Sequence, residues 1–198
     1  MSRKVIGVVG PMASGKGVVI DQLKEYGFQI YSLSDILRQT ASLIQLPPNR
    51  EILQDIGDLL RKHAGNGVLA ERTVALINQT SDSDIGIDSI RNPVEMQILS
   101  EILSARFIGV DATLERCFEN MRIRNRVGDP KTWEEFLPLA KRDRGIGQEA
   151  SGQQVESCLQ LAQPHVIQND GSLENLKQRI DAELQSLGVE GTKKQIER

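Results

Sequence analysis

Apolar and polar positions follow two different periods along the chain. Residues 4–10 form a short continuous apolar run, which is typical of a strand buried on both faces of a parallel sheet. Residues 15–26 then carry an apolar stripe at helical spacing, and Gly27 ends that pattern. The chain therefore begins with a strand, a loop and a helix.

Strand and helix patterns continue to alternate along the chain as far as residue 187. The expected strands are 28–34, 84–90, 106–112 and 165–171, and the expected helices are 35–44, 51–65, 67–79, 92–103, 113–126, a helix after the polar turn at 127–136, and 173–187. Ser34 is the expected cap of helix 35–44. Strands that alternate with helices predict an α/β fold, with a five-stranded parallel sheet covered by helices on both faces.

Composition narrows the class of protein. The chain has 198 residues and a formal net charge of -3, so no overall positive field attracts nucleic acid or a membrane surface. No apolar run approaches the roughly 20 residues that span a bilayer. Cys117 and Cys158 lie far apart on apolar helical faces, so we expect reduced, buried thiols and a cytoplasmic location.

The segment GPMASGKGVV (10–19) has the spacing of a phosphate-binding loop. It follows a buried strand and opens a helix, which is the context that this motif requires. Its glycines let main-chain N–H groups point at phosphate oxygens, the helix N-terminus adds partial positive charge, and Lys16 adds a full charge. The segment predicts a three-layer P-loop NTPase fold with ATP as cofactor. The expected phosphate contacts are Gly10, Pro11, Met12, Ala13, Ser14, Gly15, Lys16, Gly17 and Val18.

The loop lacks the usual hydroxyl after its lysine. Gly17 stands where a Ser or Thr normally helps to hold Mg²⁺. The Lys16-Gly17 pair resembles the adenylate kinase group of nucleoside monophosphate kinases, in which a threonine follows, whereas Val18 follows here. The resemblance implies that Mg²⁺ is held by phosphate oxygens, waters and a carboxylate elsewhere.

Two further segments resemble the acceptor side of adenylate kinases. SLSDILRQT (32–40) is similar to their acceptor-binding segment, which implies Asp35 and Arg38 as substrate-binding residues, with Arg38 on the acceptor phosphate. IDSIRNP (87–93) resembles an Asp-Gly-x-x-Arg segment in which Ser89 replaces the glycine. It implies that Asp88 binds Mg²⁺ through water and that Arg91 is a second clamp on the acceptor. A solvated helix arginine and a capping aspartate are the structural alternatives.

An arginine-rich stretch at about 122–148 resembles the mobile lid of this group. A lid supplies positive charge around the transferred phosphoryl group and excludes water. The resemblance implies four catalytic arginines: Arg122, Arg126, Arg142 and Arg144. A helix with a charged outer face is the alternative, and Trp133 is expected to anchor the lid helix to the body.

The sequences of two longer segments extend the resemblance. GDPKTWEEFLPLAKRDRGIGQ and IQNDGSLENLKQRI are similar to a mainly archaeal family of P-loop proteins like adenylate kinase and dephospho-coenzyme A kinase, over about residues 4–187. In such folds the turn after the last strand lies near the adenine ring, which implies base contacts from Asn169, Asp170 and Gly171. A simple capped turn is equally compatible. We treat 1–187 as one domain and 188–198 as a flexible tail.

The resemblance implies a kinase that moves the γ-phosphoryl group of ATP, with Mg²⁺, to a small phosphorylated or hydroxyl acceptor, and the expected acceptor is a nucleoside monophosphate. Dephospho-coenzyme A kinase, with Asp35 or Asp88 as base, and a nucleotide-binding regulatory module stay open. Nucleic-acid binding is disfavoured because acidic residues alternate with the arginines of 122–144 and no aromatic platform accompanies them. We expect no membrane partner, a monomer or homodimer, and structural roles for His63 and His165.

Overall fold

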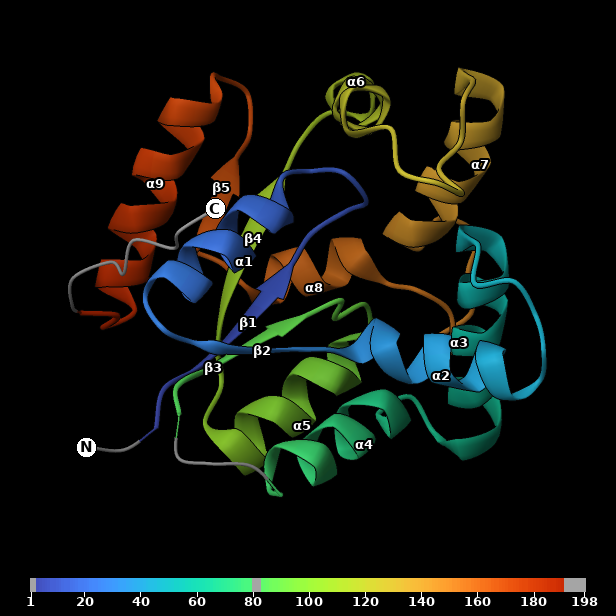
Figure 1. Ribbon diagram of the computed structural model, residues 1–198, viewed down its shortest axis with the longest axis horizontal. Coiled ribbons are helices and arrows are strands. Elements are labelled where there is room, and N and C mark those ends of the chain that lie inside the picture. The colour runs from blue at the N-terminus through green and yellow to red at the C-terminus, as the bar shows by residue number, and fades with distance from the viewer. Residues whose placement is uncertain (1–2, 80–82, 191–198) are drawn as a thin grey trace.

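The computed structural model describes residues 3–79 and 83–190 and has a parallel sheet between layers of helices (Figure 1). The strands are β1 (Val5–Val9), β2 (Gln29–Ser32), β3 (Ile85–Asp88), β4 (Arg106–Asp111) and β5 (Val166–Gln168). They pair in parallel in the order β2-β3-β1-β4-β5. Every residue of the central β1 is buried, which explains its continuous apolar run. The predicted five-stranded α/β fold is confirmed.

Helices cover both faces of the sheet. They are α1 (Lys16–Glu25), α2 (Leu33–Leu43), α3 (Arg50–Ala64), α4 (Val68–Ile77), α5 (Pro93–Leu103), α6 (Leu114–Arg124), α7 (Trp133–Arg144), α8 (Val155–Leu161) and α9 (Leu173–Ser186). Side chains alternate along β1, so that Ile6 and Val8 pack with α1 and α9, whereas Val5 and Val9 pack with α2, α3, α4, α5 and α8. Two separate cores therefore make the three layers.

Two local expectations differ from the structure. Helix α2 begins at Leu33, with Ser32 rather than Ser34 at its N-cap, and the Ser32 side chain makes no capping hydrogen bond. Helix α8 was not expected, because seven residues between a glycine-rich stretch and a strand show too little periodicity. The cis peptide bond between Gln163 and Pro164 follows this helix.

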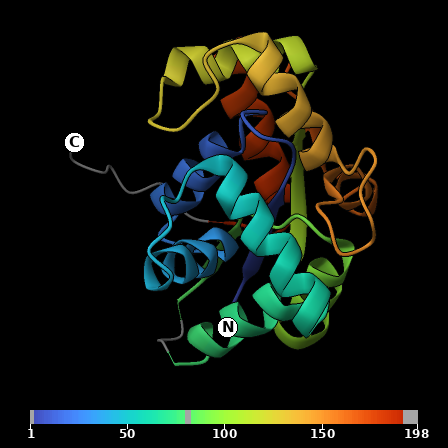
Figure 2. The same cartoon turned by 90° about the vertical axis from the view of Figure 1, so that its right-hand side faces the viewer.

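Helices α6 and α7 form a third cluster above the phosphate-binding loop. Buried Cys117 and Phe136 pack there with Met12 of the loop. Trp133 contacts Phe118 of α6 edge-on, with ring centroids 5.4 Å apart, so it anchors α7 to the body as predicted. In Figure 1, α2, α3, α6 and α7 gather on the side where β1 leads into the loop, and Figure 2 looks onto that side, with α3 crossing in front.

The chain stays packed slightly past the predicted domain end at 187. Val189 is buried against the α1–α9 core, and its N–H donates to the Leu184 carbonyl at 2.8 Å. Packing therefore extends at least to Val189, and most of the predicted tail, residues 191–198, lies outside the described residues. Within the described ranges, no helix is both long and apolar enough to cross a membrane.

Both cysteines behave as predicted from the sequence. Cys117 and Cys158 are free and buried. Burial raises the pKa of the Cys117 thiol to about 11 and raises the pKa of Cys158 even further. Neither thiol is therefore ionised at neutral pH, which is the state expected of inert core residues.

Candidate functional site

Polar side chains end the strands at the carboxyl edge of the sheet. Ser32 ends β2, Asp88 ends β3, and the two residues are partners in the parallel register. Asp111 ends β4, and Asn169 follows β5. Ligand sites of open α/β sheets form outside this edge. A cleft of about 760 Å³ opens there, a size that suits a small-molecule ligand.

The loop at the end of β1 has the backbone that an anion cradle requires. Gly10 and Gly15 have φ angles of +143° and +116°, a region that favours glycine. A Cβ on Gly10 would lie 2.1 Å from the Val110 carbonyl oxygen. Helix α1 begins at Lys16 with no side-chain cap. In its first turn the Val18 N–H donates to the Gly15 carbonyl at 2.9 Å, whereas the N–H groups of Lys16 and Gly17 have no partner within the helix and can receive an anion.

Six of the predicted loop residues line the cleft: Met12, Ala13, Gly15, Lys16, Gly17 and Val18. Gly10, Pro11 and Ser14 are buried in the loop behind them. A Cβ on Gly17 would meet no heavy atom within 4 Å. Crowding therefore does not explain why the usual hydroxyl residue is missing at this position.

Lys16 lies folded back on its own loop. Its Nζ donates to the carbonyl oxygens of Gly10 and Pro11, both at 2.7 Å. Burial, helped by the positive charge of Arg91, lowers the pKa of Lys16 to about 8, although the carboxylates of Asp88 and Asp143 oppose the shift. An anion in the cleft would give this ammonium group a stronger partner than two neutral carbonyls.

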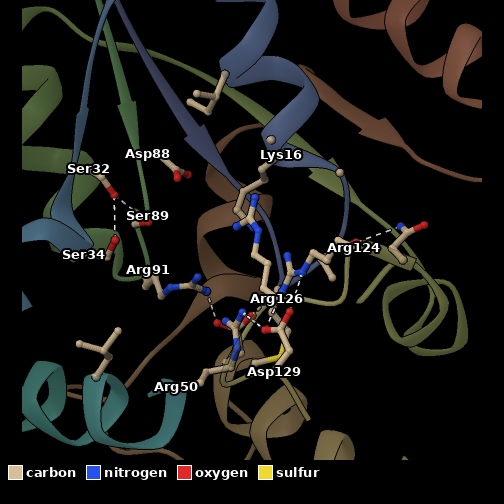
Figure 3. A pocket seen from close by; sticks show the side chains of 18 of the residues that line it. Lys16, Ser32, Ser34, Arg50, Asp88, Ser89, Arg91, Arg124, Arg126 and Asp129 are labelled. Carbon is tan, nitrogen blue, oxygen red and sulfur yellow. Dashed lines mark hydrogen bonds and ion pairs between the residues drawn. The ribbon is translucent and has the colours of Figure 1, made fainter. Parts of the chain in front are cut away.

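Asp88 faces the cleft across from Lys16 (Figure 3). Its Oδ1 is buried and has no hydrogen-bond partner among the described residues. A buried carboxylate oxygen without a partner is costly unless a water or ion satisfies it. No group of three or more His, Cys, Asp or Glu side chains that could hold a metal occurs within 3–79 and 83–190. The water-mediated contact of Asp88 with Mg²⁺ stays a prediction.

Three hydroxyl groups form a small cluster beside Asp88. The Ser32 Oγ lies 2.9 Å from the Ser34 Oγ and donates to the Ser89 Oγ at 3.0 Å (Figure 3). Ser89, the residue at the family's glycine position, has a φ of +66°, which is uncommon for a non-glycine residue. Ser89 therefore has a backbone conformation that favours glycine, and it also places a hydroxyl group at the cleft.

Arg91 is tied to the phosphate-binding loop through one carboxylate. Its guanidinium pairs with Asp143 of α7, and the other Asp143 oxygen accepts the Met12 N–H at 2.7 Å. Asp143 is almost fully buried. Hydrogen bonds to a charged group are stronger than neutral ones, so this contact fixes Arg91 relative to the loop at the cleft wall.

A second carboxylate joins two arginines that the sequence analysis did not single out. Asp129 accepts hydrogen bonds from Arg50 of α3 at 2.9 Å and from Arg124 of α6 at 2.9 and 3.0 Å. Burial acts to raise the pKa of Asp129, but the hydrogen bonds from Arg124 and Arg50 outweigh it and lower the pKa. All three residues line the cleft, and Figure 3 shows them together opposite Lys16.

The remaining predicted substrate residues also line the cleft. Arg38 and Asp35 lie one helical turn apart on α2, and 3.9 Å separates the Arg38 Nε from the Asp35 carboxylate. Both side chains are more than half exposed, so this pair contributes little to stability and Arg38 can turn toward a ligand. Arg126, beyond the end of α6, is exposed and lines the cleft too.

Three predicted catalytic arginines are not brought into the cleft. Arg122 is exposed over the Phe118 ring, 6.0 Å from its centroid. Arg142 pairs with Asp55 and Asp58 of α3, and Arg144 pairs with Asp111 and Glu156. The face of α7 that meets the cleft carries Asp143 instead. As placed, Arg142 and Arg144 hold α7 against its neighbours rather than facing phosphoryl groups.

The turn after β5 supports the loop from behind. The Asn169 side chain, which lines the cleft, donates to the Ser14 carbonyl at 2.8 Å. The Gly171 carbonyl accepts from Arg116 at 2.8 Å. Asp170 pairs with Arg179 at the surface. The Asn169 amide donor is thus occupied by the loop, and its predicted base contact stays a prediction.

The residues missed from sequence alone are Arg50, Gln54, Arg124, Asp129 and Gln153, all of which line the cleft. Asp129 belongs to the Gly-Asp-Pro sequence that we interpreted only as a turn. Gln54 lies one turn after Arg50 on α3, so an i, i+4 polar pair was the available signal. Nothing in the sequence distinguishes Gln153 from a loop glutamine.

Solved structures share this fold. Shikimate kinase from Bacteroides thetaiotaomicron has a TM-score of 0.54 at 12% identity, and the alignment covers 93% of this chain and 98% of that one. TT1252 from Thermus thermophilus has a TM-score of 0.53 at 20% identity, covering 94% and 99% of the two chains. At such low sequence identities, the structural likeness establishes only the fold, which this chain shares with P-loop kinases.

Sequence relatives identify a narrower group. No model of a protein family matches the chain. A UPF0200 protein from Hyperthermus butylicus is 33% identical over 145 residues, which are 73% of this chain and 78% of the relative. Another, from Methanoregula boonei, is 30% identical over 177 residues, or 89% and 93% of the two chains. This chain belongs to the UPF0200 family.

Proposed function

We propose that the protein is a phosphotransferase that moves the γ-phosphoryl group of ATP to a nucleoside monophosphate. One observation carries the proposal: a phosphate-binding loop and a second group of cationic side chains line the same cleft. The loop supplies Lys16 and the start of α1, and the second group consists of Arg38, Arg91 and Arg126. A transfer between two anionic substrates requires these two halves.

The donor half fits a nucleotide triphosphate with Mg²⁺. Lys16 would exchange two carbonyl partners for phosphate oxygens, and the first-turn N–H groups of α1 would donate to the same phosphates. The Asp88 Oδ1 would accept a hydrogen bond from a metal-bound water. Bound Mg²⁺ would supply neutralising charge at the phosphates. Because Gly17 has no hydroxyl to bind Mg²⁺, Asp88 is the protein side chain that would hold the metal, through its bound water.

The acceptor half would hold a phosphate monoester in line with the donor. Arg91 is positioned by Asp143, which also contacts the loop, so the acceptor clamp and the donor cradle share one rigid connection. Arg38 and Arg126 are exposed enough to close on a ligand. Their charges would stabilise the transferring group without a covalent intermediate.

A hydroxyl acceptor is the second candidate, and the unpartnered Asp88 oxygen favours it. A hydroxyl acceptor needs a base for its proton, and Asp88 lies beside the serine cluster where such a group could bind (Figure 3). Dephospho-coenzyme A and a small ring alcohol such as shikimate belong to this class, and a shikimate kinase is one of the solved proteins that share the fold.

A coupled assay of ADP formation from ATP and Mg²⁺ tests the proposal. The acceptors are AMP, CMP, GMP, UMP, dephospho-coenzyme A and shikimate, and a Lys16→Ala preparation reports contaminating kinases. We expect at least one nucleoside monophosphate to raise ADP formation well above the acceptor-free rate. If only a hydroxyl acceptor does so, the second candidate holds. Equal rates with and without every acceptor would refute phosphoryl transfer and leave a nucleotide-binding module.

A further inference from the structure

The side-chain amide of Gln54, on helix α3, lines the cleft and has one atom without a hydrogen-bond partner among the described residues. The Gln54 side chain is buried and lines the cleft. Its Nε2 donates to the Gln153 Oε1 at 3.1 Å and lies 3.5 Å from the Leu139 carbonyl oxygen. A backbone carbonyl only accepts hydrogen bonds, so the Leu139 carbonyl assigns this end of the amide as nitrogen. The Gln54 Oε1 is buried and has no hydrogen-bond partner among the described residues.

A second unpaired atom lies one turn earlier on the same helix. Arg50 faces the cleft at i-4 from Gln54, and its Nε is buried without a partner in the described ranges, although its Nη2 pairs with Asp129. The α2–α3 and α6–α7 connections close over this end, where Asn49 and Gly128 approach each other. Two buried polar atoms without partners on one cleft-facing surface indicate a ligand that supplies them.

The amide oxygen of Gln54 favours an uncharged part of the ligand. An amide oxygen accepts hydrogen bonds and repels an anion, so a phosphate does not suit Gln54. Asp129 already offsets charge on Arg50 and Arg124. A neutral O–H or N–H donor satisfies the Gln54 oxygen. The phosphate of the same ligand belongs at cationic residues of the cleft such as Arg38 and Arg91.

On the basis of the proposed function, we propose that Gln54 determines acceptor specificity. Its Oε1 accepts a hydrogen bond from an O–H or N–H group of the acceptor's nucleoside part. Gln153 positions the Gln54 amide from the segment after α7. A site built to hydrogen-bond a substrate group discriminates strongly against analogues that lack it.

Gln54→Met tests the inference, with Gln22→Met as the matched control. Gln22 is another buried glutamine with an unpaired Oε1 among the described residues, but its amide joins α1 to α9 and does not line the cleft. Titration calorimetry with AMP, CMP, GMP and UMP should show roughly tenfold weaker binding of the preferred monophosphate to Gln54→Met. Its affinity for Gln22→Met, and the ATP affinity of both variants, should change less than twofold.

Ligand analogues provide a second test, and its first measurement uses only the unmodified protein. For the preferred monophosphate, the 2′-deoxy and 3′-deoxy analogues each remove one hydroxyl donor, and an analogue methylated on a base nitrogen removes one N–H donor. One of them should bind the unmodified protein about tenfold more weakly and bind Gln54→Met without a further loss. If every analogue binds like its parent, or if Gln54→Met binds the monophosphate normally, the inference is overturned while the proposed function stands. If no monophosphate binds, both are overturned.

Discussion

Replacing Lys16 with alanine should weaken ATP binding by roughly 10- to 100-fold and reduce acceptor-dependent turnover by about 10²- to 10³-fold. The Lys16 ammonium lies in the loop that would hold the phosphates and has only two carbonyl partners to give up. A hydrogen bond to a charged group contributes about 1.5–3 kcal/mol, and loss of one donor at a developing charge typically costs 10²- to 10³-fold in rate. Titration calorimetry and the ADP assay measure the two effects.

The pH dependence of ATP binding separates this charge effect from a general disturbance. Because the pKa of Lys16 is about 8 in the free protein, the ammonium form that binds phosphate is lost as pH rises above that value. ATP affinity of the unmodified protein should fall by up to about tenfold per pH unit above 8, and Lys16→Ala should lose this dependence. Lys62→Ala, on the exposed surface of α3, is the control. Unchanged ATP affinity in Lys16→Ala would refute the assignment of the loop.

Replacing Arg61 with methionine should lower the free energy of unfolding by about 3–5 kcal/mol. Arg61 of α3 and Glu95 of α5 form an ion pair at 2.9 Å with side chains only 1% and 0% exposed. The other Glu95 oxygen accepts the N–H groups of Arg91 and Asn92 at the start of α5. Removal of one partner leaves a buried charge without compensation. Urea unfolding measures the loss.

Two further variants make the stability test specific. Arg179→Met removes an ion pair with Asp170 in which both side chains are well exposed, and it should cost less than about 1 kcal/mol. Adding Glu95→Gln to Arg61→Met removes the stranded charge and should recover part of the lost stability. A loss below about 1 kcal/mol in Arg61→Met itself would show that the pair does not stabilise the packing of α3 on α5.

The sheet and the loop were predictable because each depends on a local pattern. The buried run 4–10 and the spacing of Gly10, Gly15 and Lys16 leave one strand–loop–helix arrangement. The predicted start of α2 was wrong by two residues, because Ser32 and Ser34 are both residues that favour the N-cap position and the helix begins at Leu33, directly after Ser32. Helix α8 is too short to show a clear period.

The sequence alone could not predict which arginines line the cleft. Arg124, Arg126, Arg142 and Arg144 are alike in type and lie close together in sequence, yet the first two line the cleft and the last two form ion pairs elsewhere. Which face of α7 meets the cleft depends on contacts with distant residues, such as Asp58 of α3 and Asp111 of β4. The sequence does not distinguish buried Arg61 from a surface arginine either, because its partner Glu95 lies 34 positions away.

A crystal structure with a non-hydrolysable ATP analogue and Mg²⁺ tests the central claim most directly. The account predicts that oxygens of the β- and γ-phosphates accept hydrogen bonds from main-chain N–H groups within residues 13–18. Lys16 Nζ should leave the Gly10 and Pro11 carbonyls for a phosphate, and a metal-bound water should lie against Asp88. A polyphosphate bound away from the loop, with Lys16 still on its two carbonyls, would contradict the account.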